Sequence, residues 1–132
     1  MPNTRMEKEL WVTTSNEIGT LAKVCAPISE ARVNIWGVCA WGEKDRGYFR
    51  LFTDDNQKAL TALKTAGFTA EEREAVTTEL ENKPGTCFHA VQKLAQAGVN
   101  INYWYYTACG NCTTGKIVFS TNNNQKALEV LR

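Results

Sequence analysis

Apolar residues in the first half of the chain predict a strand, a helix, a hairpin and a second helix, in that order. Residues 8–15 are β-prone and stop at the turn formers Asn16 and Gly19, which indicates a strand. Leu21, Val24, Cys25, Ile28 and Ala31 then recur at helical spacing and mark one apolar face, with Pro27 inside it. Residues 33–41 and 48–53 predict a hairpin around the polar segment 42–47. A helix that begins at Asp54 or Asp55 and is ended by Gly67 follows.

The second half of the chain repeats this order. Residues 68–80 predict a strand that ends the first unit and begins the second. A helix over 86–97, strands over 99–106 and 116–121 and a helix over 124–131 follow. The predicted fold class is therefore α+β: two ferredoxin-like βαββαβ units in tandem, with antiparallel sheets and the helices on one face. The last strand of the second unit is missing after Arg132 or is supplied by another segment, because an open sheet edge is usually covered or paired.

Direct comparison of the two halves supports a duplication. At a shift of 66, residues 16–35 and 82–101 are identical at 7 of 20 positions, and at a shift of 68, residues 47–63 and 115–131 are identical at 8 of 17. The run Asn56-Gln57-Lys58-Ala59-Leu60 reappears whole as residues 124–128. The ordered blocks predict unit one over residues 1–73 and unit two over residues 74–132, with one insertion inside the second.

Charge and size narrow the class of function. The 132 residues carry 15 basic and 14 acidic side chains, a net charge of +1, which argues against nucleic-acid or membrane-surface partners. The sequence shows neither a membrane span nor an export signal, so a cytoplasmic location is expected. The five cysteines are then expected to be reduced thiols.

The repeated motifs resemble the ACT domain family, and more narrowly its stand-alone tandem members. The resemblance rests on the Asn-x-x-Gly turns, on the helices that end at residues 31–35 and 97–101, and on the late Asn-Gln-Lys-Ala-Leu helix. It implies a regulatory or sensor protein that has no catalytic domain and is no enzyme, with no cofactor. An amino acid or similar small polar ligand would lie between ACT units. A homodimer and a regulated metabolic enzyme are the implied partners.

Each copy supplies five candidate ligand-binding residues under this resemblance. They are Asn16, Gly19, Thr20, Asn34 and Ile35 in unit one, and Asn82, Gly85, Thr86, Asn100 and Ile101 in unit two. An Asn amide offers both donor and acceptor to a zwitterion, and the turn before each helix offers free N–H groups to a carboxylate. The turn asparagines could equally serve as caps. Asn34 and Asn100 carry more of the inference, because Asn is disfavoured at the start of a strand.

The two copies differ at their helix starts. Ile18 stands where the family usually has proline, and Cys87-Phe88-His89 opens the second helix. Either difference predicts two unequal sites, of which one can have lost its ligand.

Cys109-Gly110-Asn111-Cys112 supports an alternative function, a metal- or thiol-handling hairpin. Zinc requires about four ligands, and Cys39, Cys87 and His89 lie on other predicted elements. No metal site is therefore predicted. A structural interaction module without a ligand is the other alternative.

Aromatic residues on the predicted hairpins indicate an interface. Strict alternation would place Ile101, Tyr103 and Tyr105 on one face of the strand, and Trp104 and Tyr106 on the other. The same alternation places Trp36 and Trp41 on opposite faces in the first unit. Packing in a homodimer explains such exposed aromatic residues, and the near-neutral charge disfavours the alternative of RNA stacking.

Overall fold

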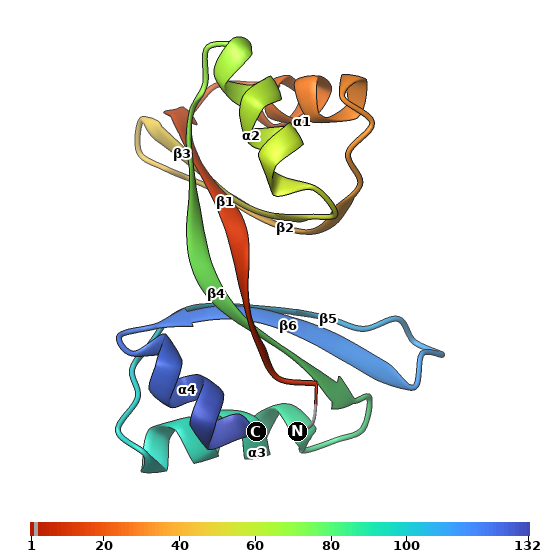
Figure 1. Ribbon diagram of the computed structural model, residues 1–132, viewed down its shortest axis with the longest axis vertical. Coiled ribbons are helices and arrows are strands. Elements are labelled where there is room, and N and C mark those ends of the chain that lie inside the picture. Colours follow the sequence, from red (N-terminus) through yellow and green to blue (C-terminus); the bar gives the residue numbers. More distant parts are fainter. Residues whose placement is uncertain (2) are drawn as a thin grey trace. The chain divides into compact units, whose positions relative to one another are not determined.

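The computed structural model describes Met1 and residues 3–132, which form ten elements (Figure 1). In chain order these are β1 (Arg5–Ser15), α1 (Thr20–Glu30), β2 (Ile35–Glu43), β3 (Arg46–Thr53), α2 (Asn56–Thr65), β4 (Thr69–Glu81), α3 (Thr86–Gln96), β5 (Ile101–Thr107), β6 (Thr114–Thr121) and α4 (Asn124–Leu131). The predicted α+β fold with two ferredoxin-like units is confirmed. The chain divides into an N-terminal unit, Lys8–Arg73, and a C-terminal unit that joins Met1–Glu7 to Glu74–Arg132.

The N-terminal unit has the strand order β2-β3-β1-β4, with α1 and α2 packed side by side on one face (Figure 1). Antiparallel pairing places Leu10 opposite Leu51 and Val12 opposite Phe49. These residues face the helices and form a core with apolar residues of α1 and α2, among them Ile28, which is fully buried. The apolar face predicted for α1 from helical spacing is therefore the face that packs on the sheet.

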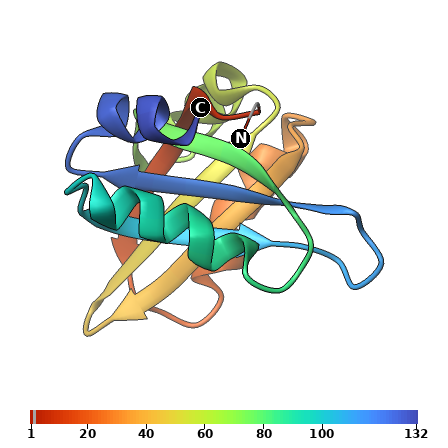
Figure 2. The ribbon, with the colours of Figure 1, turned by 90° about the horizontal axis from the view of Figure 1, so that it is seen from below.

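The C-terminal unit repeats this plan with the order β1-β4-β6-β5, and Figure 2 shows α3 and α4 side by side on its strands. The N-terminal segment Met1–Glu7 belongs to this unit and lies beside β4, at the position of the fourth strand. Thr4 Oγ1 lies 2.8 Å from Thr78 Oγ1, and Thr77 Oγ1 donates to Glu7 Oε2 at 2.8 Å. Residues from the start of the chain thus line the edge of β4 that α4 leaves without a following strand.

A bulge at the start of the second strand of each unit changes which side chains share a face. The pairing register shifts between Ile35 and Gly37 in β2, and between Ile101 and Tyr103 in β5. As a result Ile101 and Trp104 both pack on the core of the C-terminal unit. The strict alternation predicted for this strand is wrong, because a bulge adds one residue and reverses the pattern beyond it.

The same bulge corrects the placement of the tryptophans in β2. The Trp36 ring lies 5.7 Å from that of Phe52, and Trp41 stacks on Tyr48 at 5.4 Å. Tyr48 and Phe52 alternate to the same face of β3, so both tryptophans lie on the face away from the helices. The prediction that they point to opposite faces is wrong.

The repeated Asn-Gln-Lys-Ala-Leu run fastens the last helix of each unit to its sheet. Asn56 Nδ2 donates to the Lys8 carbonyl at 2.9 Å, and Asn124 Nδ2 donates to the Glu74 carbonyl at 3.4 Å. The residue before each run caps the helix, since the side chains of Asp55 and Asn123 accept from a backbone N–H three residues later. This motif therefore has a structural explanation that is the same in both units.

Candidate functional site

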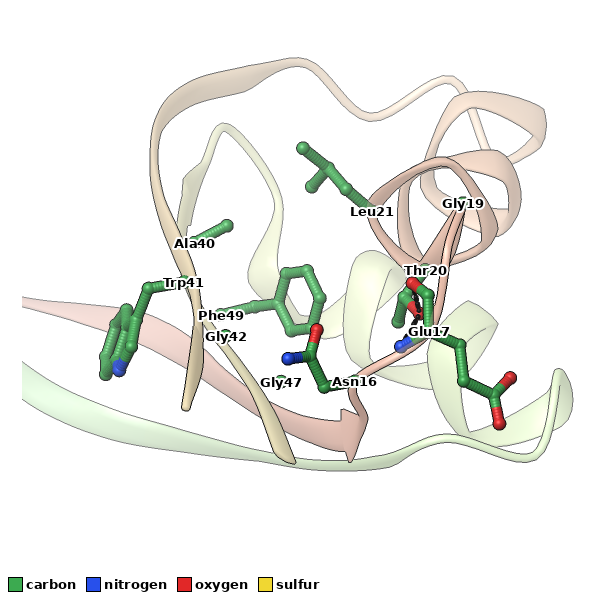
Figure 3. Close-up of a pocket in the computed structure, with 10 residues that line it drawn as sticks. All are labelled: Asn16, Glu17, Gly19, Thr20, Leu21, Ala40, Trp41, Gly42, Gly47 and Phe49. Carbon is green, nitrogen blue, oxygen red and sulfur yellow. Dashed lines mark hydrogen bonds between the residues drawn. The ribbon is translucent and has the colours of Figure 1, made fainter. Parts of the chain in front are cut away.

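A pocket of about 290 Å³ opens in the N-terminal unit between the start of α1 and the β2–β3 hairpin (Figure 3). Its lining residues are Asn16, Glu17, Gly19, Thr20, Leu21, Ala40, Trp41, Gly42, Gly47 and Phe49. Three of the predicted site residues, Asn16, Gly19 and Thr20, therefore meet in one cavity. The other lining residues come mostly from the hairpin.

The inner wall of the pocket is apolar. Ala40 of β2 pairs with Phe49 of β3, so their side chains share the helix-facing side, and Leu21 of α1 approaches from above them (Figure 3). Phe49 is nearly buried, whereas Leu21 is 45% exposed. The ring of Trp41 points away from the pocket (Figure 3). It stacks instead on Tyr48 of β3. The cavity thus offers a small apolar surface that water reaches.

Asn16 forms the polar side of the pocket and fixes the hairpin. Its backbone N–H donates to the Asp45 carbonyl at 2.9 Å, and its Nδ2 donates to the Lys44 carbonyl at 3.0 Å. The amide packs closely on Gly42, where an added Cβ would come within 2.6 Å of Nδ2. Gly42 therefore leaves the space that the Asn16 amide occupies.

The start of α1 offers backbone donors to the pocket. Gly19 is the N-cap at φ 84°, a left-handed conformation that favours glycine, and it has no side chain to cap the helix. Thr20 Oγ1 donates to the Glu17 carbonyl at 2.7 Å. Within the described part of the chain, the N–H groups of Leu21 and Ala22 find no acceptor. Such N–H groups at the positive end of a helix dipole favour an anion.

In the C-terminal unit, the turn that corresponds to Asn16–Gly19 also forms hydrogen bonds to its hairpin, which is longer. Asn82 Nδ2 donates to the carbonyls of Cys109 at 2.9 Å and Cys112 at 3.0 Å. Gly85 is again a left-handed N-cap, at φ 90°, and Thr86 Oγ1 donates to the Glu81 carbonyl at 2.7 Å. Asn16 and Asn82 thus have equivalent structural roles as donors to the hairpin.

The second pair of predicted asparagines lies outside the pocket. The Asn34 N–H donates to Asp54 Oδ1 at 3.0 Å, and the Asn100 N–H donates to Asn122 Oδ1 at 3.0 Å. Both asparagines are exposed, and among described residues neither side-chain amide has a hydrogen-bond partner. The neighbouring Ile35 and Ile101 pack on the two cores. The structure therefore does not bring Asn34 to Asn16, or Asn100 to Asn82, within a cavity.

The cysteines differ from the expectation of five reduced thiols. Cys109 and Cys112 form a disulfide at the exposed tip of the β5–β6 hairpin, while Cys25, Cys39 and Cys87 are free. Burial raises the pKa of Cys25 and, despite the nearby Arg50 charge, also that of Cys39. Among the described residues no cluster of three or more His, Cys, Asp or Glu side chains is placed to hold a metal ion.

Several lining residues could not be found from motifs alone. Ala40 and Phe49 meet because of the hairpin register, which the sequence does not state. Gly47 did carry a signal, because it is identical to Gly115 in the second copy. Gly47 lines the pocket beside the start of α1, whereas the neighbour of Gly115 is the Tyr106 ring.

The architecture is a tandem of ferredoxin-like units, and the first unit carries the pocket described above. A family model described as an ACT domain pair matches residues 6–132, and the chain belongs to this family. ACT domain pairs are typical of regulatory modules that bind small ligands. No curated protein sequence matches the chain. Among helices of the described residues, none is long and apolar enough to cross a membrane.

Solved structures support the same fold. Protein BT0572 from Bacteroides thetaiotaomicron is 28% identical, with a TM-score of 0.89 over 98% of this chain and 88% of that one. The regulatory subunit of aspartate kinase from Thermus thermophilus, in its ligand-free form, is 16% identical with a TM-score of 0.67, over 97% and 93% of the two chains. E. coli aspartokinase III in complex with aspartate and ADP is 18% identical with a TM-score of 0.61, over 98% of this chain and 31% of that one.

Proposed function

We propose that the protein is a regulatory module that binds a free amino acid in the pocket of the N-terminal unit. The observation that carries the proposal is the combination of unpaired N–H groups at the start of α1 with a polar rim and an apolar inner wall. These are the three contacts that an α-amino acid requires. The volume of about 290 Å³ lies at the lower end of small-molecule sites, which suits a ligand of this size.

The pocket suggests one orientation for the ligand. Its carboxylate would accept from the N–H groups of Leu21 and Ala22, where the helix dipole favours negative charge. Its ammonium would lie beside Asn16 Oδ1, and the exposed Glu17 side chain, which points away from the pocket in Figure 3, would have to turn inward to bring its carboxylate to the ammonium. Its side chain would lie against Phe49, which favours an apolar or small side chain over a charged one.

Thermal-shift screening against the twenty amino acids, followed by calorimetry, tests this proposal. The best ligand should lose most of its affinity when its carboxylate is converted to an amide. Glu17→Gln should weaken binding by about tenfold, the effect of about 1.4 kcal/mol from a partly solvated charge. Lys83→Gln is the matched control, because Lys83 is the counterpart of Glu17 in the other unit. If no amino acid raises the melting temperature, or if Glu17→Gln binds as wild type, the proposal fails.

We propose that Asn34 and Asn100 could contribute to ligand binding only in a homodimer. β2 is an edge strand, and its Trp36 and Val38 are 58% and 46% exposed. Pairing of this edge in a homodimer would cover both side chains and bring the unpartnered Asn34 amide near a second chain. We therefore expect Asn34→Ala to weaken ligand binding, and Asn100→Ala, the same change in the C-terminal unit, is the matched control. Equal affinity in wild type and Asn34→Ala would remove Asn34 from the site.

Regulation also requires that ligand binding change the affinity for another protein. We propose an enzyme of amino-acid metabolism in the cytoplasm as this partner, a role consistent with the fold shared with aspartate kinase regulatory subunits. A binding measurement with and without the amino acid checks this, because coupling must appear in both directions. An interaction module without a ligand would show partner binding that the amino acid leaves unchanged.

The disulfide supports a second candidate function in thiol–disulfide exchange. Cys109 and Cys112 are exposed and bonded to each other, so neither is available as a thiolate ligand for a metal. An external dithiol would reduce this bond while it is itself oxidised to a disulfide. Thiol counting after incubation with a dithiol protein distinguishes this function, since Cys109→Ser/Cys112→Ser must abolish the reaction without affecting amino-acid binding.

A further inference from the structure

The counterpart of the pocket in the C-terminal unit can be located residue by residue. Ala40 pairs with Phe49 in the first hairpin, and Tyr106 pairs with Ile117 in the second. Gly47 and Gly115 follow at the same shift of 68 that relates Phe49 to Ile117. Tyr106 therefore stands at the position that Ala40 holds in the N-terminal unit.

The Tyr106 ring fills space that stays open beside Ala40. A Cβ added at Gly115 would lie 2.5 Å from Tyr106 Oη and 2.6 Å from its Cε2, so the phenol lies directly on this glycine. At Gly47 the corresponding added Cβ would first meet Thr14 Oγ1, and Gly47 instead lines the open pocket. The two glycines thus differ in what lies on them: a phenol ring covers Gly115, whereas the smaller Thr14 hydroxyl lies on Gly47, which also lines the pocket.

A difference in charge also disfavours a zwitterion in the C-terminal unit. Glu17 at the rim of the pocket is replaced by Lys83, which forms an ion pair with Glu81 at 3.1 Å and would repel an ammonium group. Ile117 is buried as its counterpart Phe49 is, so the two units do not differ at this position. The Tyr106 ring and the charge of Lys83 are the two differences that disfavour a ligand here.

We propose that Tyr106 is a built-in occupant that closes the second site, so that the chain takes one ligand and not two. The residue at the Ala40/Tyr106 position decides whether a unit is open. The count of one ligand rests on the proposed function, whereas the closure by Tyr106 does not. A ring-sized apolar probe can therefore test the closure by itself.

The probe is p-cresol, which reproduces the side chain of tyrosine beyond its Cα. Ala40→Tyr closes the N-terminal pocket and removes any background binding there. Adding Tyr106→Ala to this variant should create saturable p-cresol binding, at least about tenfold tighter than in Ala40→Tyr alone. The amide signal of Gly115 in NMR spectra should shift on titration, and that of Gly47 should not. Equal p-cresol affinity in both variants would overturn the proposal.

Gly115→Ala provides a second test if truncation of Tyr106 unfolds the protein. The added methyl must displace the ring from its position, so the Tyr106 ring signals should move relative to their positions in wild type. Unmoved ring signals in folded Gly115→Ala would also overturn the closure. With the amino acid, wild type should bind one molecule per chain and Ala40→Tyr none. If wild type binds no amino acid but p-cresol behaves as described, the proposed function fails and the closure stands.

Discussion

Asn82 should hold its hairpin more firmly than Asn16 does, and Asn82→Ala measures the difference. The Asn82 amide donates to two carbonyls, at 2.9 and 3.0 Å, whereas the Asn16 amide donates to one, at 3.0 Å. A hydrogen bond contributes about 0.5–1.5 kcal/mol, and these exposed bonds belong in the lower half of that range. Asn82→Ala should therefore cost about 1–2 kcal/mol of local stability, and Asn16→Ala about half as much.

Hydrogen exchange at the substituted residue itself is the appropriate assay. The backbone N–H of residue 82 donates to the Thr113 carbonyl and that of residue 16 to the Asp45 carbonyl, both at 2.9 Å, and alanine retains this N–H. After correction for intrinsic rates, exchange should accelerate by about 5–30-fold in Asn82→Ala and by about 2–5-fold in Asn16→Ala. Asn82→Asp, which keeps the size but places carboxylate oxygens against the two carbonyls, should accelerate exchange at least as much as Asn82→Ala. Equal acceleration at both sites, or wild-type exchange in Asn82→Asp, would refute the reasoning.

Three further predictions concern other parts of the chain. Val38→Lys places a charge on the exposed β2 edge, so light scattering should show a shift from dimer to monomer; a wild type that is already monomeric would contradict the dimer. The raised pKa values of Cys25 and Cys39 mean that the folded state holds these protons more tightly. Unfolding free energy should therefore fall as the pH rises above about 8.5, and Cys→Ser at both positions should flatten this slope in urea titrations. Cys109→Ser/Cys112→Ser should cost at most about 2 kcal/mol, the entropy of a very short loop, and a larger loss in urea denaturation would contradict a merely local disulfide.

Local signals in the sequence were sufficient to predict the two units and most of their elements. Helical spacing identified the buried face that contains Val24 and Ile28, and Asp55 and Gly67 delimit α2 as caps do. These features depend on residues within one or two turns of each other. The sequence of a single segment is therefore enough to predict where a helix begins and ends and which face it buries.

The bulges could not be predicted from alternation, because a single extra residue reverses every later side chain. Ile35 looked like the regular start of a strand, and the shift of register beside it becomes visible only in the pairing with Thr53 and Phe52. The pocket depends on the same long-range information. Its inner wall requires Ala40 to lie opposite Phe49, and the repeat comparison gave no register for that hairpin.

The predicted site residues also divide into those that are close in sequence and those that are distant in sequence. Asn16, Gly19 and Thr20 are close in sequence, and the structure places them together in the pocket. Asn34 is distant in sequence, and its backbone pairs with Asp54 outside the pocket. A contribution from Asn34 to ligand binding would need a second chain.

The assignment of Met1–Glu7 to the C-terminal unit means that no single cut separates the chain into two complete folding units. A fragment of residues 74–132 would lack the hydrogen bonds that Thr78 and Thr77 form with Thr4 and Glu7, and the edge of β4 would be exposed. A short deletion or a bulky fusion at the start of the chain should thus disturb the unit at its far end first. Folding of the C-terminal unit thus depends on two segments, Met1–Glu7 and Glu74–Arg132, that lie on either side of the N-terminal unit in the sequence.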